Sequence, residues 1–151
     1  MKNEFEYSLV VYLLLFFLCS CGPRVDLDFG QWGDKAYLTN VQIFTLKADE
    51  HELQEYYESG MLTPAIRRKI ISSGNALIDN EKYTAIIFVP SDQNLMKSGL
   101  IFYHQAEKIV PLNNAPIAGI ITSLMEEVDY HYKVISADGS ENVWTVTIVL
   151  K

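Results

Sequence analysis

The amino-acid sequence predicts a mainly β protein, a β-sandwich with a short helical insertion near residues 49–72. Several short segments rich in β-branched and aromatic residues follow one another, with turn residues between them. Helical spacing is clear at only one place, near the start of the domain, so strands and helices do not alternate as they do in a βαβ fold. The last two segments alternate apolar and polar residues around a glycine-containing turn, as the strands of a half-buried hairpin do.

The N-terminus has the features of a secretory signal. Residues 9–18 are apolar without a charge, and this run is too short to span a membrane, which takes about 20 residues. Leu18, Cys19, Ser20 and Cys21 follow, and they resemble the bacterial lipobox, in which Leu at −3 and a small residue at −1 precede the lipidated Cys. The resemblance implies that Cys21 is acylated and that the chain is cut before it. The alternative is a buried N-terminal strand or helix with two ordinary cysteines.

The lipobox divides the chain into three parts. Residues 1–20 are the expected signal peptide, residues 21–35 a tether rich in Gly and Asp, and residues 36–151 the folded domain. After cleavage Cys21 is the one cysteine left, so the mature chain would form no internal disulfide and keep no catalytic thiol. We therefore expect a lipid-anchored protein of the cell envelope, in the outer membrane, whose first partner is the bilayer.

The first element expected in the domain is a strand over residues 36–47, where β-branched and aromatic residues gather. A short helix is expected over residues 48–59, with Asp49 as its cap, Glu52 three positions on and Gly60 after its end. Its apolar and aromatic residues at helical spacing are Leu53, Tyr56 and Tyr57. Periodicity does not decide whether residues 65–72 form helix or strand.

The remaining elements are expected to be strands. The polar segment 79–82 suits a hairpin link and residues 113–116 suit a turn. The strand candidates before the C-terminal hairpin are residues 75–78, 83–89, 100–103 and 108–111. In the hairpin itself, Gly139 supplies the positive φ of a tight turn between residues 129–136 and 142–150. Its predicted core face carries Tyr130, Tyr132, Val134, Trp144, Val146, Ile148 and Leu150.

The hairpin carries a resemblance to a known group. Residues 132–148 resemble the terminal hairpin of immunoglobulin-like domains of unknown function in Bacteroidetes envelope lipoproteins, where Tyr-x-Val-x-Ser/Ala-x-Asp-Gly precedes a closing Trp/Tyr-x-Val-x-Val/Ile strand. Residues 85–90 and 105–111 are similar to middle strands of that group, and the match covers about residues 75–150. The resemblance implies an immunoglobulin-like sandwich, found in that group next to domains predicted to act in carbohydrate metabolism. The helical stretch departs from it.

No motif predicts an enzyme, a cofactor or a metal. His51 begins the run His-Glu-Leu-Gln-Glu, which has Glu where a zinc-protease helix has its second His. Ser73 lacks the preceding Gly and the strand-turn-helix context of a nucleophile elbow. The acids Glu126, Glu127 and Asp129 are expected to be solvated charges. The formal net charge of −7 argues against a nucleic-acid partner, because phosphates would be repelled.

Three aromatic residues are the candidate binding residues. Trp32 lies in the tether, and Tyr56 and Tyr57 lie on an acidic helix where burial is difficult. Exposed rings stack on sugars or protein partners, although packing of the helix against the sandwich would also account for a tyrosine there. We therefore expect a non-catalytic binding or accessory module for glycans or a host surface. The alternative is a structural or assembly protein that engages another envelope protein through an exposed sheet edge.

Overall fold

The computed structural model describes residues 34–151. The expected signal peptide 1–20, the lipobox with Cys21, and Trp32 all lie outside the described residues. Of the described residues, 45% lie in strands and 11% in helices, which confirms a mainly β protein.

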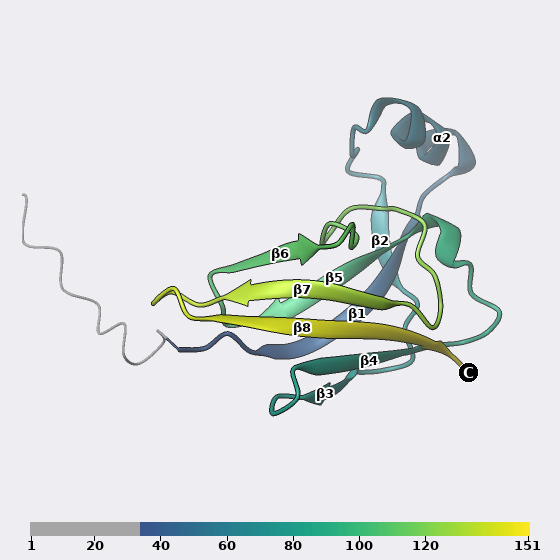
Figure 1. The fold of residues 1–151 in the computed structure, drawn as a ribbon. Coiled ribbons are helices and arrows are strands. Elements are labelled where there is room, and N and C mark those ends of the chain that lie inside the picture. The colour runs from purple at the N-terminus through teal and green to yellow at the C-terminus, as the bar shows by residue number, and fades with distance from the viewer. Residues whose placement is uncertain (1–33) are drawn as a thin grey trace, which may run out of the picture. The chain divides into compact units, whose positions relative to one another are not determined.

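Residues 34–151 contain eight strands in two sheets, and the α-helix lies outside the sheets (Figure 1). The three-stranded sheet has the order β2-β1-β5, and the five-stranded sheet has the order β3-β4-β8-β7-β6. Neighbouring strands are antiparallel except β4 and β8, which are parallel. The strands are β1 (Leu38–Lys47), β2 (Arg67–Ile70), β3 (Leu77–Asp79), β4 (Thr84–Val89), β5 (Ser98–His104), β6 (Lys108–Leu112), β7 (Asp129–Ile135) and β8 (Glu141–Leu150).

The two sheets bury a common core, so the predicted β-sandwich is confirmed. Alternate residues of β4, β7 and β8 are buried, as expected for strands with one face against a core. From the smaller sheet, Val41, Ile43 and Leu100 are fully buried against them. The immunoglobulin-like assignment within the sandwich class stays a prediction.

The C-terminal hairpin has the predicted buried face. Tyr132 lies directly opposite Trp144 in the antiparallel register, and both side chains are fully buried. The other predicted core positions, Tyr130, Val134, Val146 and Ile148, are also buried, and Leu150 is half-buried. Gly139 has φ 85° in the turn, as the hairpin requires.

Trp144 joins the two sheets. Its indole N–H donates to the carbonyl oxygen of Ala36 at 3.1 Å, just before β1 begins. Tyr83 packs edge-on against the indole with the ring centroids 5.6 Å apart. The phenol of Tyr132 donates to the Pro116 carbonyl oxygen at 2.8 Å, so both large buried aromatics satisfy their polar ends.

The region 65–72, for which helix and strand were both open, contains the strand β2. β2 pairs with the last part of β1, from the pair Phe44–Ile70 to the pair Lys47–Arg67. All four residues of β2 are exposed, three of them are cationic, and the strand is the outer edge of its sheet. We call the paired segments 44–47 and 67–70 the ribbon, and it carries the chain out to the helix (Figure 1).

The helix α2 (Glu50–Ser59) lies between β1 and β2, where the sequence predicts it. Gly60 ends it with φ 73°, and its N–H donates to the Tyr56 carbonyl oxygen at 2.8 Å. The expected side-chain cap is wrong: Asp49 is at the N-cap position, but its carboxylate makes no capping hydrogen bond. No residue of α2 is buried, so packing on the sandwich does not account for its tyrosines.

The sandwich assignment predicts unequal costs for two neighbouring substitutions in β8. Trp144→Ala removes a fully buried indole and should lower the free energy of unfolding by about 3–5 kcal/mol. Thr145→Ser, on the opposite face, keeps a hydroxyl near His131 and should cost less than about 1 kcal/mol. Urea unfolding of residues 22–151 measures both. Equal small losses would mean that the alternation does not mark a buried face.

The β7–β8 turn predicts a pH-dependent contribution to stability. Hydrogen bonds from the hydroxyl and amide of Ser140 and from the Ser136 hydroxyl lower the pKa of the Asp138 carboxyl below its ordinary value. The ionised carboxylate therefore stabilises the fold above the unfolded-state pKa of about 3.9, and this contribution is lost as the pH falls through the lower folded-state pKa.

Asp138→Ala should thus be less stable than the parent at neutral pH, and the difference in unfolding free energy should narrow as the pH falls. The measurement is urea unfolding of both proteins across this pH range, where the other carboxyls are common to both and cancel. A difference in unfolding free energy that stays constant with falling pH would contradict the role given to Asp138.

Candidate functional site

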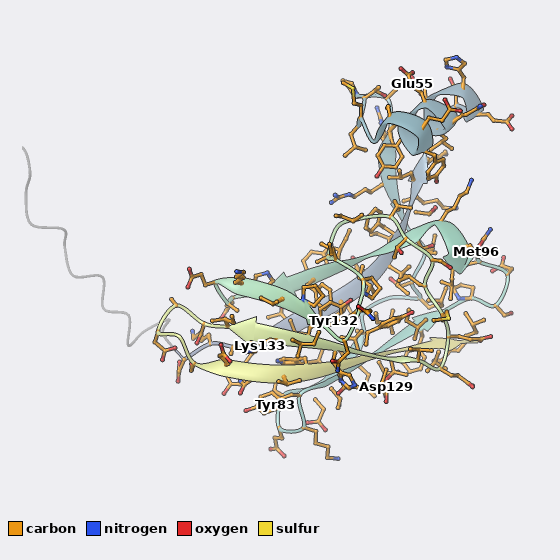
Figure 2. The ribbon with its side chains drawn as sticks, turned by 45° about the horizontal axis from the view of Figure 1, so that its top comes forward. Glu55, Tyr83, Met96, Asp129, Tyr132 and Lys133 are labelled. Atoms are coloured by element: carbon orange, nitrogen blue, oxygen red, sulfur yellow. The ribbon has the colours of Figure 1, made fainter. Side chains whose placement is uncertain are left out.

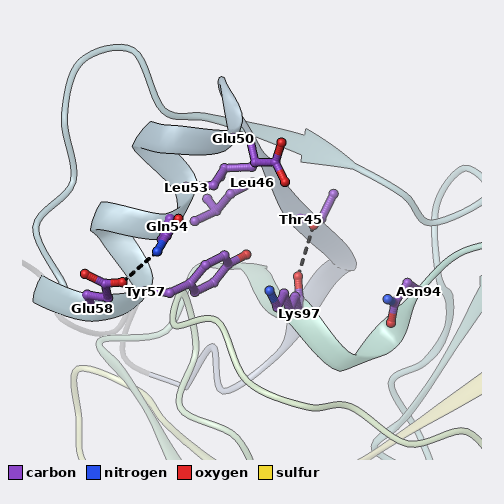
Figure 3. Close-up of a pocket in the computed structure, with 9 residues that line it drawn as sticks. All are labelled: Thr45, Leu46, Glu50, Leu53, Gln54, Tyr57, Glu58, Asn94 and Lys97. Atoms are coloured by element: carbon purple, nitrogen blue, oxygen red, sulfur yellow. Dashed lines mark hydrogen bonds between the residues drawn. The ribbon is translucent and has the colours of Figure 1, made fainter.

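A polar pocket lies beneath α2, between the helix, the end of β1 and the short 3-10 helix η2 (Leu95–Lys97) (Figure 3). Its volume is about 620 Å³, within the range of about 300–1,000 Å³ that small-ligand sites usually have. Six of its nine lining residues are polar or charged. The lining residues are Thr45, Leu46, Glu50, Leu53, Gln54, Tyr57, Glu58, Asn94 and Lys97.

Side chains from two neighbouring rows of α2 form the upper wall of the pocket. Leu53 and Tyr57 are four residues apart and therefore share one side of the helix. Glu50, Gln54 and Glu58 follow the same four-residue spacing in the adjacent row. The Gln54 side-chain amide donates to Glu58 Oε1 at 3.0 Å, which holds both side chains along the helix.

The lower wall is held by hydrogen bonds around η2. The Asn94 side chain accepts from the Met96 N–H at 2.8 Å and so caps η2. The buried Ser98 hydroxyl donates to the Asn94 carbonyl oxygen at 2.9 Å. From β1, the Thr45 hydroxyl donates to the Lys97 carbonyl oxygen at 3.0 Å (Figure 3). These bonds fix the backbone from which Lys97 reaches into the pocket.

Tyr57 joins the two walls. The Lys97 ammonium nitrogen lies 4.3 Å from the centroid of the Tyr57 ring, a cation–π contact. Partial burial, and next the neighbouring Tyr56, raise the pKa of the Tyr57 phenol above its ordinary value. The phenol is therefore neutral at physiological pH and can donate a hydrogen bond. The side chain remains 39% exposed, so part of the ring is open to a ligand.

The predicted binding residues are placed differently by the structure. Tyr57 is one of the residues that line the pocket, and its role in binding stays a prediction. Tyr56 is outside the lining and packs edge-on against Tyr57, with the ring centroids 5.5 Å apart. Trp32 and the lipidation site Cys21 lie outside the described residues.

Sequence reasoning missed the rest of the pocket. Asn94 and Lys97 are about forty positions from α2 and belong to a segment that reads as a polar loop. The signal available on the helix was the four-residue spacing of Glu50, Gln54 and Glu58 beside the tyrosine. The same spacing is typical of a helix face that is simply solvated. The presence of Asn94 and Lys97 opposite the helix shows that this face lines a pocket.

Between residues 34 and 151, no three or more His, Cys, Asp or Glu side chains lie together as metal ligands would. His51 lies on the exposed surface of α2. Within the same range, no helix has the length and apolar character needed to cross a bilayer.

Comparison with solved structures finds the same fold elsewhere. A "putative secreted protein" from Bacteroides fragilis NCTC 9343 superposes with a TM-score of 0.54. It is 19% identical in sequence, and the match covers 78% of this chain and 97% of that one. At this identity the likeness shows a shared fold. No protein-family model and no curated protein sequence matches the chain.

Proposed function

We propose that this chain is a non-catalytic, lipid-anchored binding module of the bacterial cell envelope and that its ligand is a glycan bound beneath α2. The observation that carries the proposal is the composition of the pocket. An aromatic ring, two side-chain amides, carboxylates and an ammonium group surround one open space. An aromatic ring can stack on the apolar face of a sugar ring, and the amide, carboxylate and ammonium groups can form hydrogen bonds with the sugar hydroxyls.

The position of the pocket in the chain supports a role in binding away from the bilayer. The proposed tether joins the domain at the start of β1, and the pocket lies at the other end of the same strand (Figure 1). Thr45, which lines the pocket, is seven residues beyond Leu38, or about 23 Å along the strand. A pocket displaced by this distance from the tether can meet large ligands without competing with the membrane for space.

The exposure of the acids supports binding over catalysis. Glu50 and Glu58 are both exposed. A catalytic carboxylic acid needs burial or a closely placed like charge to stay protonated near neutral pH. The match to a Bacteroides protein described as secreted, together with the lipobox resemblance, supports the envelope location and an anchor in the outer membrane.

Three of the four sheet edges argue against the alternative of an assembly protein that pairs strands with a partner, and the first part of the fourth, β5, is covered by residues 119–122, which bond to Ser98 and Leu100. The edge strand β2 is short and cationic, β3 has three residues, and β6 contains Pro111, which cannot donate a ladder hydrogen bond. Short, charged or proline-containing edges are the usual protection against such pairing.

The glycan proposal predicts that replacing Tyr57 weakens glycan binding, whereas replacing another exposed tyrosine does not. On a printed array of neutral and charged glycans, the full chain in non-ionic detergent should bind a defined subset. Tyr57→Ala should weaken that binding by about tenfold or more, because it removes the central aromatic contact. Tyr103→Ala, similarly exposed on β5, is the matched control and should bind like the parent. Binding that survives Tyr57→Ala would place the site elsewhere, and an array without any bound glycan would contradict the proposal.

The anchor proposal predicts that Cys21 carries the lipid. Cys21→Ala should abolish labelling by radioactive palmitate and release the protein from the membrane fraction, because each buried CH₂ of an acyl chain contributes about 0.8 kcal/mol to membrane binding. Cys19→Ala is the control and should keep both properties. Labelling that persists in Cys21→Ala, or that depends on Cys19, would show the lipobox assignment to be wrong.

A further inference from the structure

The pocket beneath α2 contains opposite charges that do not pair with one another. Glu50 and Glu58 lie on the helix wall, and Lys97 lies on the wall formed by η2. The ion pairs between side chains of residues 34–151 are Lys82–Asp79 at 3.8 Å and Lys133–Glu141 at 2.7 Å, and both lie outside the pocket. These three side chains are exposed, so in the free protein water solvates their charges, and a charged ligand can replace that water.

The ring of Tyr57 accounts for this separation. Figure 3 shows the ring extending from α2 toward Lys97, with the carboxylates of Glu50 and Glu58 on the helix side. Lys97 contacts the ring face, and Glu58 accepts its hydrogen bond from Gln54. Each charge thus has a neutral neighbour inside the pocket and keeps its capacity for an ionic contact with a ligand.

The two walls continue this division of charge beyond the pocket. The sequence of α2 contains four glutamates and no lysine or arginine. On the sheet side, Lys69 is the register partner of Thr45, which lines the pocket. Side chains of directly opposed strand residues point to the same face, so Lys69 shares the face of Thr45 but is not one of the residues that line the pocket. The neighbouring Arg68 points to the opposite face, where its guanidinium lies over the Phe44 ring and donates to the Gly119 carbonyl oxygen.

These charges select among the classes of glycan. A purely anionic polymer would be repelled by a chain of net charge −7 and by the helix wall. A neutral sugar would leave the carboxylates and the ammonium groups without ionic partners. A sugar with one cationic and one anionic group meets both walls with the complementary charge and is not repelled as a whole.

We propose that the ligand of this pocket is a zwitterionic sugar, with an amino group and an acidic group on the same or adjacent rings. Its ammonium group contacts Glu58, its phosphate or carboxylate contacts Lys97, and its ring lies against the exposed part of the Tyr57 ring. This inference rests on the proposed glycan-binding function and names the chemical class of the ligand.

The probes are four sugars that combine an amino or an N-acetylamino group with the presence or absence of a 6-phosphate. Glucosamine 6-phosphate carries both charges, N-acetylglucosamine 6-phosphate keeps the negative one, glucosamine keeps the positive one, and N-acetylglucosamine carries neither. Their affinities for the full chain in non-ionic detergent are measured by NMR titration. Charge-assisted contacts on both walls should make glucosamine 6-phosphate bind about tenfold more tightly than either singly charged sugar.

Substitutions on each wall test which side chain contacts which charged group of the sugar. Lys97→Gln should lower the affinity for glucosamine 6-phosphate to about that for glucosamine, and Lys97→Arg should restore it because the cation is kept. Glu58→Gln, which retains the oxygen that accepts from Gln54, should weaken the two amino sugars and leave the two N-acetylated sugars unchanged. Lys82→Gln, far from the pocket on the β3–β4 turn, is the control for loss of one positive charge and should change none of the affinities.

Two results would overturn the inference. If the four sugars bind equally and all depend on Tyr57, the glycan site stands and the charged side chains are merely solvated. If N-acetylglucosamine 6-phosphate binds as well as glucosamine 6-phosphate, the helix wall has no ionic role and the ligand is anionic. Failure of the glycan-binding function itself is a separate outcome, seen as an array without Tyr57-dependent binding.

Discussion

The hydrogen bond from the Trp144 indole to the Ala36 carbonyl oxygen is the contact on which the arrangement of the molecule depends. It joins the central strand of the larger sheet to the point where β1 begins, inside a cluster completed by Tyr83 and Tyr132. With its start fixed there, β1 lays Val41 and Ile43 into the core and leaves the sandwich at a defined place. The place where β1 leaves the sandwich sets the positions of the ribbon and of α2, and α2 forms one wall of the pocket.

The elements that stabilise the fold are therefore different from the elements that carry the proposed binding residue Tyr57. The fully buried side chains belong to strands of the sandwich, including Phe44 where the ribbon begins, whereas α2 contributes none and β2 is exposed throughout. Elements with so little buried apolar surface open locally at lower cost than a core strand does. The pocket wall on such an element can adjust to the proposed ligand, while the hydrogen bond from Thr45 to Lys97 holds the other wall. In Figure 2, Glu55 marks α2 and Met96 marks η2.

The sequence allowed the core to be predicted because a buried strand face leaves a period of two, as in Trp144, Val146 and Ile148. It could not decide β2, since an edge strand of consecutive cations has no buried face to produce that period. The cap at Asp49 failed because its side chain is free to point elsewhere on an exposed helix start. Tyr57 was identified as a residue that is hard to bury, but Asn94 and Lys97 become its neighbours only through tertiary structure.

Hydrogen exchange of the full chain, with and without a glycan that binds on the array, tests the central claim most directly. If the pocket is the binding site, added glycan should slow amide exchange in residues 45–58 and 94–98 and leave the edge strand β6 unchanged. Slower exchange confined to β6 or to the β7–β8 turn would contradict the account, as would a bound glycan that leaves the exchange of α2 unaltered.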